Sequence, residues 1–288
     1  MIGFIGVGKM GASLAGRLVD GGDLLVYDRH APAADDLVAR GARFAGPEQM
    51  VAECDVVLTC LPAPTHVRDL FLGEGGLAAA LRSGTLVIDM TTSTPLVDQE
   101  IAAALRERGV DFVDAPIAGG TRRVSDGKAT LMVGATADAY PRAAAILHRI
   151  TPDVVHVGDI GAGHTMKLVN NLLNACNRIA AMESIRIGEA HGIRRDVLID
   201  VLNRGSGRNY TTETTYPQLL SGPEPLPTNF ALELYLKDVR LANEIAAAAA
   251  QDNRIGRLVE SGLEHATAAL GGQTDISDFT AHWSWPED

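Results

Sequence analysis

The first thirty residues contain a glycine pattern with the spacing of a dinucleotide-binding loop. Gly6, Gly8 and Gly11 give G-x-G-x-x-G directly after the apolar run Ile2–Ile5. The first glycine permits a tight turn, the second lets the backbone approach a pyrophosphate, and the third lets a helix pack closely on a strand. The start of that helix offers unpaired N–H groups and the positive end of its dipole to the phosphates. We therefore predict cofactor contacts at Gly6, Val7, Gly8, Lys9, Met10 and Gly11.

An acidic residue follows the second apolar run, at the distance from the glycine loop that a dinucleotide-binding site requires. Asp28 follows Leu24–Tyr27 and lies twenty residues after Gly8. A carboxylate there accepts hydrogen bonds from the adenosine ribose and repels a 2′-phosphate, so NAD is the expected cofactor, with NADP as the alternative. The adjacent Arg29, a further predicted cofactor contact, would partly offset that repulsion. A glycine turn in an unrelated α/β protein is the competing interpretation, and the strand, helix, strand and terminal acid together argue against it.

A stripe of polar side chains on an apolar helix is the second candidate site. Lys167, Asn171, Asn174 and Arg178 are spaced i, i+4, i+7 and i+11, so they share one face of a helix predicted from Thr165 to about His191. Asparagines are mediocre helix formers, and a lysine in the first turns of a helix opposes its dipole. Such a lysine, beside amides that can bind a substrate, is a candidate catalytic group. The pattern alone leaves open an exposed lysine on a bundle helix.

Strands and helices alternate from the start of the chain to about Val157, which predicts a mostly parallel, doubly wound sheet. Ligands of such sheets bind beyond the carboxyl ends of the strands, which draws attention to Leu61–Pro64, Met90–Pro95 and Ala115–Gly120. Leu61, Pro62 and Thr92 are the cofactor contacts predicted there. Helix capping by the threonines and serine before Pro95 is compatible with that role.

The pattern changes near residues 158–163, after which it is helical to about Leu270. Helices are predicted near 195–202, 230–251 and 254–270. The segment 204–229 is rich in glycine and proline and is predicted to be a long loop, a kind of segment that is usually functional or mobile.

Composition excludes several classes of partner and site. The chain has 288 residues, of which 46% are hydrophobic, and a net charge of −11, which argues against nucleic acid or an anionic membrane as the main partner. Cys54, Cys60 and Cys176 have no metal-ligand spacing, so we expect reduced core residues and no metal site. No apolar stretch is long enough to span a membrane, and little sequence precedes the glycine motif, so the expected location is cytoplasmic.

Four ordered motifs together resemble the β-hydroxyacid dehydrogenases, the group of 3-hydroxyisobutyrate dehydrogenase and tartronate semialdehyde reductase. The resemblance extends over nearly the whole chain. Besides the glycine loop, the motifs are Asp114-Ala115-Pro116-Ile117-Ala118-Gly119-Gly120 followed by Gly127, Gly161-x-Gly163-x-x-x-Lys167-x-x-Asn170-Asn171, and Leu236-Lys237-Asp238-x-x-Leu241-Ala242.

The resemblance implies an α/β Rossmann-type domain over residues 1–162 and an all-α domain over residues 163–288, linked by a long interdomain helix. It also implies a homodimer or homotetramer built through the helical domain. The implied reaction is hydride transfer between NAD(P) and a small, anionic 3-hydroxy acid, giving the semialdehyde or ketone. The acid would be similar to 3-hydroxyisobutyrate, or to the product of a 2-hydroxy-3-oxo acid reductase.

Residue roles follow from the same resemblance. Lys167 matches the family's catalytic lysine and Asn171 its partner. Thr92 and Lys237 match positions near the nicotinamide end of the cofactor. The implied substrate contacts are Ala118, Gly119, Gly120 and Asn171.

Two departures from the family's pattern concern the substrate. Ala118 stands where the family usually has serine, so the substrate carboxylate would rely more on backbone N–H groups. Arg122 and Arg123 directly follow the turn, where small residues are common. They are either solvated or part of a site for a substrate with a second anionic group.

Two other functions remain as alternatives. An imine reductase-like enzyme would generally lack the lysine at position 167. A non-catalytic NAD(P)-binding interaction module would be expected to have lost Lys167 and Asn171, and both are present.

Overall fold

The computed structural model describes residues 1–222 and 227–283 of the chain. The chain divides into two compact units, Met1–Lys167 and Leu168–Asp288. The division falls within helix α8 (Ala162–Ala190), close to the predicted boundary between residues 162 and 163. Pro223 and Pro225 of the predicted loop lie outside the described residues.

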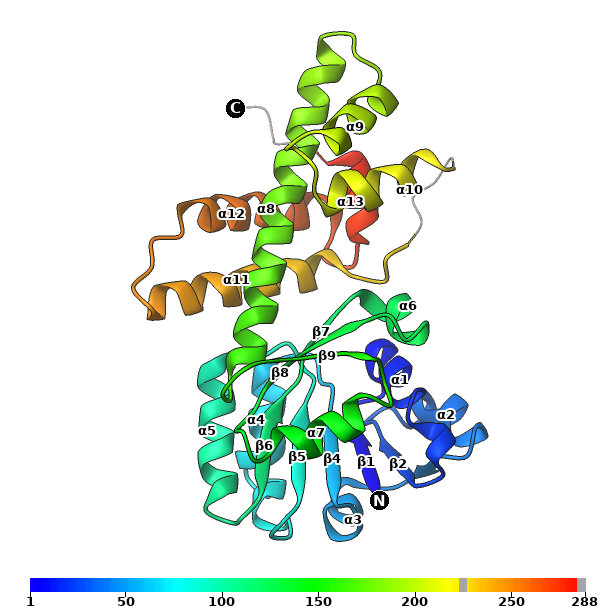
Figure 1. Cartoon of the computed structure of the whole chain (residues 1–288), viewed down its shortest axis with the longest axis vertical. Coiled ribbons are helices and arrows are strands. Elements are labelled where there is room, and N and C mark those ends of the chain that lie inside the picture. The colour runs from blue at the N-terminus through cyan, green and yellow to red at the C-terminus, as the bar shows by residue number, and fades with distance from the viewer. Residues whose placement is uncertain (223–226, 284–288) are drawn as a thin grey trace. The chain divides into compact units, whose positions relative to one another are not determined.

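The first unit is built on a sheet to which the described residues contribute nine strands (Figure 1). The strand order is β3-β2-β1-β4-β5-β6-β8-β7, and β9 pairs with β8. Neighbours from β3 to β6 are parallel, whereas β8 is antiparallel to β6 and β7. The strands are β1 Ile2–Ile5, β2 Leu24–Tyr27, β3 Arg43–Phe44, β4 Val56–Thr59, β5 Leu86–Asp89, β6 Asp111–Asp114, β7 Ile117–Ala118, β8 Thr130–Gly134 and β9 Asp153–Gly158.

Helices cover both faces of this sheet (Figure 1). Phe4, Leu58 and Ile88 are register neighbours in one apolar cluster, while Val57 and Val87, one residue earlier, belong to the cluster on the other face. Because both faces of the sheet are buried, the sequences of the central strands are continuous runs of apolar residues. The helices of the unit are α1 Lys9–Ala15, α2 Asp35–Ala39, α3 Pro47–Glu53, α4 Pro64–Leu72, α5 Pro95–Arg106, α6 Gly120–Ser125 and α7 Tyr140–Leu147.

The position of the glycine loop follows from the strand order. β1 lies between β2 and β4, so the chain runs from β1 outward through β2 to β3 on one side and then crosses over to β4 on the other side. Ligands of doubly wound sheets bind at this switch point, beyond the carboxyl ends of the strands. The sheet therefore places the loop after β1 where a dinucleotide site is expected.

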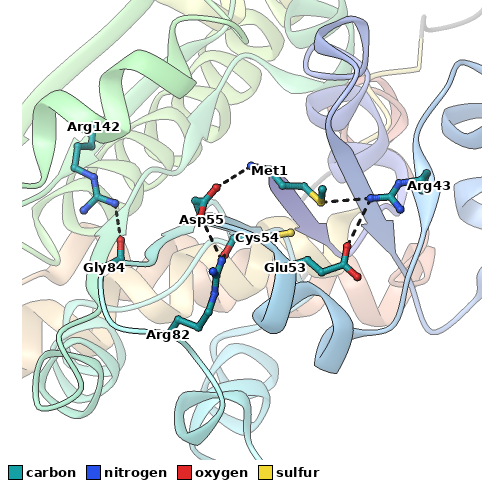
Figure 2. A network of polar contacts seen from close by, with 8 residues as sticks. All are labelled: Met1, Arg43, Glu53, Cys54, Asp55, Arg82, Gly84 and Arg142. Carbon is teal, nitrogen blue, oxygen red and sulfur yellow. Dashed lines mark hydrogen bonds and ion pairs between the residues drawn. The ribbon is translucent and has the colours of Figure 1, made fainter.

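Polar contacts tie together the loops at the opposite, amino end of the sheet (Figure 2). The Met1 amino group donates to Asp55 Oδ2 at 2.9 Å, and Arg82 donates to Asp55 Oδ1 at 3.2 Å. Arg142 donates to the carbonyl oxygen of Gly84 at 2.7 Å. Exposed ion pairs contribute about 0–1 kcal/mol each, so these contacts mainly order the loops.

The second unit is helical and packs around the later part of α8. Its core includes Ile179 and Met182 of α8, Tyr235 of α11 and Phe279 of α13. Among the described residues, no helix is long and apolar enough to cross a membrane. The helices after α8 are α9 Arg195–Arg204, α10 Tyr216–Leu220, α11 Leu232–Ala248, α12 Arg254–Leu270 and α13 Ile276–His282.

The second unit differs from the sequence prediction at two places. The segment predicted as a loop contains a π-helical turn, Thr211–Thr215, that leads into α10. Asn209 starts this turn, since its Oδ1 accepts the N–H of Thr211 at 2.9 Å. The short helix α13 was also not predicted. Asp275 caps it by accepting the N–H of Ser277 at 2.9 Å, a cap that the sequence Asp275-Ile276-Ser277 could have signalled.

Candidate functional site

The three glycines of the loop after β1 have different surroundings. Gly6 has φ +90°, and a Cβ there would overlap the carbonyl oxygen of Cys60. A Cβ on Gly11 would overlap the carbonyl oxygen of Gly6, so only glycine lets α1 lie this close to the turn. Gly8 is exposed, and no described atom lies within 4 Å of the place where its Cβ would be. The backbone at Gly8 is therefore open to a pyrophosphate, which fits NAD(P).

Asp28 is held against this loop by backbone donors. Its Oδ2 accepts the N–H of Val7 at 3.0 Å, and its Oδ1 accepts the N–H of His30 at 2.9 Å. A carboxylate has about four lone-pair sites, so both oxygens can also accept a ribose hydroxyl. Arg29 is exposed beside it. The structure thus brings Asp28 next to the glycine loop, as the predicted ribose contact requires.

Hydrogen bonds join the loops after β4 and β5. Thr91 Oγ1 accepts the N–H of Leu61 at 2.9 Å. Asp89 Oδ1 accepts the Thr59 hydroxyl at 2.7 Å and the N–H of Thr91 at 3.1 Å. Thr91 is buried, so it orders the two loops from within. The predicted contacts that remain wholly or partly accessible there are Leu61, Pro62 and Thr92.

The turn predicted to bind the substrate carboxylate lies between β7 and α6. Ala118 ends β7, and the exposed Gly119 and Gly120 have φ values of +132° and +67°, which favour glycine. Arg123 lies over this turn, because a Cβ on Gly119 would come within 3.0 Å of the Arg123 Cβ. The Arg122 guanidinium is exposed and makes no hydrogen bond within the described residues.

A buried cluster of ionisable side chains, which the sequence did not predict, lies near these loops. Asp89, Asp98, Asp114 and His164 are all 0% exposed. His164 Nδ1 lies 2.6 Å from Asp98 Oδ2. Asp114 accepts the N–H of Gly161 at 2.7 Å and that of His164 at 2.9 Å, so it binds the start of α8. The acids that end two adjacent strands, β5 and β6, were the available sequence signal.

The cluster surrounds an imidazole with carboxylates. Burial alone would lower the pKa of His164, but attraction and hydrogen bonding from Asp98, with Asp114 and Asp89, raise it to about 9. Burial raises the pKa of Asp89 and that of Asp114 to about 6, against the attraction of His164. Near neutral pH the cluster therefore contains an imidazolium.

The same cluster also has a spacing that a metal ion could use. Asp89, Asp98 and His164 each offer a ligand atom, and these atoms lie within 4.8 Å of one another. A metal ligand needs an unprotonated ring nitrogen, whereas His164 Nδ1 lies at hydrogen-bond distance, 2.6 Å, from Asp98 Oδ2. The arrangement therefore favours an ion pair over a metal site.

Lys167 lies in the second turn of α8 and is half-buried. The helix begins at Ala162, earlier than the predicted Thr165. The helix dipole acts mainly within the first turn, so the predicted opposition between Lys167 and the dipole is weaker than the sequence indicated.

Asn171 lies one turn beyond Lys167 and is held by a carboxylate. Its Nδ2 donates to Asp238 Oδ2 at 2.6 Å, and its Oδ1 accepts from Asn170 at 3.1 Å. Lys237 Nζ donates to Asp238 Oδ1 at 2.8 Å. Asp238, only 3% exposed, thus fixes two of the predicted site residues, Asn171 and Lys237.

The remaining polar residues of the stripe have a structural role. Asn174 Oδ1 accepts the Tyr235 hydroxyl at 2.8 Å, and Arg178 donates to Thr280 Oγ1 at 2.5 Å. Asn174 and Arg178 thus have partners within the second unit, whereas Lys167 and Asn171 are the members of the stripe with predicted site roles. Buried polar groups need hydrogen-bond partners, and the helices of the second unit provide them here.

Comparisons with known proteins cover almost the whole chain. Residues 1–158 match the model of the NAD binding domain of 6-phosphogluconate dehydrogenase. Residues 161–283 match that of the NAD-binding domain of NADP-dependent 3-hydroxyisobutyrate dehydrogenase.

Individual relatives agree with these family models. The chain is 38% identical over 267 residues to an NAD-dependent L-serine dehydrogenase from Pseudomonas aeruginosa, covering 90% of each chain. It is 34% identical to a 2-(hydroxymethyl)glutarate dehydrogenase from Eubacterium barkeri, covering 84% of this chain and 81% of that one. The structure of Mycobacterium tuberculosis 3-hydroxyisobutyrate dehydrogenase with L-serine superimposes with a TM-score of 0.87, at 29% identity and 97% coverage of both chains. The chain therefore belongs to the β-hydroxyacid dehydrogenase family and is an NAD(P)-dependent hydroxy acid dehydrogenase.

Proposed function

We propose that this enzyme interconverts a small, anionic 3-hydroxy acid with its semialdehyde or ketone. The observation that carries the proposal is the pair Lys167 and Asn171, one turn apart on α8, in a chain whose glycine loop is open at Gly8. NAD(P) held by the glycine loop would supply the hydride chemistry at the carbinol carbon. Lys167 accepts the hydroxyl proton as alkoxide character develops, and returns it in the reverse direction.

Asn171 is the proposed partner of Lys167. Residues four apart lie on the same helix face, so Asn171 can orient the lysine or the substrate hydroxyl. Its hydrogen bond to Asp238 fixes its side chain before substrate binds. Exposed backbone N–H groups of the Gly119-Gly120 turn would bind the substrate carboxylate, in keeping with the missing hydroxyl at Ala118.

The test is a screen of 3-hydroxy acids with the purified protein and NAD or NADP. 3-Hydroxyisobutyrate, L-serine and 2-(hydroxymethyl)glutarate belong in the panel, because relatives of this chain are named for them. At least one acid should support formation of reduced nicotinamide. Activity with cyclic imines alone would favour an imine reductase, and cofactor binding without any turnover would favour a non-catalytic module.

The cofactor preference is a prediction of its own. Asp28 should repel the 2′-phosphate of NADP, so kcat/KM should be higher with NAD than with NADP. The matched variant is Asp28→Asn, which keeps an oxygen for the N–H of Val7 but removes the charge, and it should narrow the preference. An NADP preference of tenfold or more, worth about 1.4 kcal/mol, would contradict this role of Asp28.

Arg122 is proposed to select substrates with a second negative charge. Its exposed guanidinium follows the Gly119-Gly120 turn and has no partner in the described part of the chain, whereas Arg123 donates to the carbonyl oxygen of Lys128 at 2.6 Å. Arg122→Ala should raise KM for a dicarboxylic hydroxy acid by about tenfold, the effect of a lost charged contact worth about 1.4 kcal/mol.

The control is a monocarboxylic substrate. Arg122→Ala should leave its KM nearly unchanged, in contrast to the KM of the dicarboxylic substrate. Arg123→Ala measures the neighbouring arginine separately, and Arg106→Ala removes an exposed arginine at the last residue of α5. An equal rise in KM with both substrate classes would indicate that Arg122 is only a solvated surface residue.

We also propose a homodimer or homotetramer formed through the helical unit. Leu173, Ile187 and Val201 of this unit are 60%, 63% and 60% exposed, so they are apolar side chains that an interface between subunits could cover. Sedimentation velocity at micromolar concentration should give a species larger than a monomer. A monomer throughout that range would contradict the proposal.

A cytoplasmic location is proposed on the state of the cysteines. Cys54, Cys60 and Cys176 lie in the described residues and are all unpaired, as is usual in a reducing compartment. Cell fractionation of the source organism would test the location, and recovery in an extracytoplasmic fraction would contradict it.

A further inference from the structure

We propose that His164 and Asp98 are positioning residues whose buried charge pair sets the place of Lys167. This inference rests on the proposed function, because it concerns how the chain holds the group that moves the proton. The pair itself was not apparent from the motifs, since Asp98 and His164 are 66 positions apart in the sequence.

The cluster connects the start of α8 with the rest of its unit. Asp114, at the end of β6, binds the N–H groups of Gly161 and His164, and these belong to the last residue before α8 and its first turn. A Cβ on Gly163 would overlap Asp114 and a backbone oxygen of Met132, so this turn lies directly against the sheet. The ring of His164 then reaches Asp98 on α5 at 2.6 Å.

Lys167 follows His164 by three residues on the same helix, so a shift or rotation of the first turn would move both. Asp89 joins the same cluster to the loops after β4 and β5 through Thr59 and Thr91. One set of buried contacts therefore fixes the lysine and the predicted cofactor loops. A displacement of about 1 Å in a catalytic group can cost about 10²-fold in rate.

The cluster depends on the charge of His164. The titratable groups that act most strongly on its ring are Asp98 on α5, Asp114 on β6 and Asp89 on β5, and all three are acids. Asp98 Oδ1, Asp89 Oδ2 and His164 Nε2 are buried without a hydrogen-bond partner within the described residues. The attraction between the His164 ring and the carboxylates therefore acts on the cluster in addition to the hydrogen bonds of Asp98, Asp89 and Asp114. Removing one partner of a buried pair leaves an uncompensated charge, which is strongly destabilising.

The first experiment uses near-isosteric neutral variants. His164→Gln and Asp98→Asn each remove one charge, the double variant removes both, and His156→Gln is the control histidine in the same unit, facing a carbonyl oxygen instead of a carboxylate. Each single variant should lower kcat by about 10- to 100-fold, with a smaller change in KM. The double variant should recover much of the loss, and His156→Gln should resemble the wild type.

The second experiment does not depend on activity. Nitrogen NMR of the wild type, with the His164 resonances assigned from His164→Gln, should show a protonated ring at pH 8. The His164 pKa is raised from 6.5 to about 9 in the folded protein, so its contribution to stability is complete below about pH 6.5 and is lost as the pH rises through about 9. This fall in unfolding free energy should be smaller in His164→Gln.

The outcomes separate this inference from the proposed function. Wild-type kcat in both single variants, or a neutral His164 ring at pH 8, would overturn the positioning role even if Lys167→Ala is inactive. An inactive wild type would overturn the proposed function and with it the positioning role. If a single variant does not fold, the ring charge measured in the wild type decides: a neutral ring overturns the inference and a protonated ring supports it.

Discussion

Replacing Lys167 with alanine is expected to lower kcat by about 10²- to 10⁴-fold, the usual contribution of a general acid–base group. Affinity for NADH should stay near the wild-type value, because the loop from Gly6 to Gly11 provides the main cofactor contacts. The fold should persist, since alanine is the best helix former and Lys167 is only half-buried. Steady-state kcat, the Kd for NADH and the melting temperature together separate a loss of chemistry from a loss of folding.

Two further variants complete this test. Lys128→Ala removes an exposed lysine of the same unit and should leave kcat unchanged. Asn171→Ala should give a smaller loss of kcat than Lys167→Ala, together with lower stability, because Asp238 then loses one of its donors. Loss of stability without loss of kcat in Asn171→Ala would assign that residue a structural role alone.

Gly8→Ala and Gly11→Ala are both expected to weaken cofactor binding, but for different reasons. The place of a Cβ on Gly8 is open, so Gly8→Ala should fold normally but raise the Kd for NADH by about 10- to 100-fold, a loss of about 1.4–2.8 kcal/mol. A Cβ on Gly11 would overlap the carbonyl oxygen of Gly6, and such overpacking typically costs about 1–3 kcal/mol of stability. Gly11→Ala should therefore lose both stability and cofactor binding.

Thermal unfolding and calorimetric titration with NADH distinguish the two glycines. Gly16→Ala is a poor control because Arg40 lies against that glycine, whereas a Cβ on Gly22 would meet no described atom within 4 Å. Gly22, however, has φ +79°, a conformation that strains any other residue, so Gly22→Ala is the control for a strained glycine outside the loop. It should lower stability and leave the affinity for NADH normal. Unchanged NADH affinity in Gly8→Ala would contradict the placement of the pyrophosphate.

The fold was largely predictable because its signals are local. Ile2–Ile5, Leu24–Tyr27 and Arg254–Leu270 were predicted at the bounds that the structure shows, and the predicted Rossmann-type sheet with a helical second half is confirmed. A buried parallel strand is a short apolar run, and proline marks the first helical position of α3. Within the segment predicted as a loop, the helical stretch from Thr211 to Leu220 was missed, because the surrounding glycines and prolines conceal a turn that Asn209 starts through a side-chain hydrogen bond.

The candidate site was predictable only where its residues follow one another in the sequence. The glycine loop and the Gly119-Gly120 turn each form one continuous stretch. The buried pair of Asp98 and His164 comes from two helices, and only the fold brings it together. The roles of Asn174 and Arg178 could not be predicted from the sequence either, because their hydrogen-bond partners, Tyr235 and Thr280, lie far along the chain.

The central claim is that Lys167 takes the proton while hydride leaves the carbinol carbon of a 3-hydroxy acid. Its most direct test is single-turnover formation of reduced nicotinamide, with the best acid from the screen and its analogue deuterated at that carbon. The wild type should form reduced cofactor at a rate that deuterium slows, and Lys167→Ala should be slower by about 10²- to 10⁴-fold at saturating cofactor and substrate. A Lys167→Ala rate above about a third of the wild-type rate, far outside the usual loss of an acid–base group, would contradict the claim.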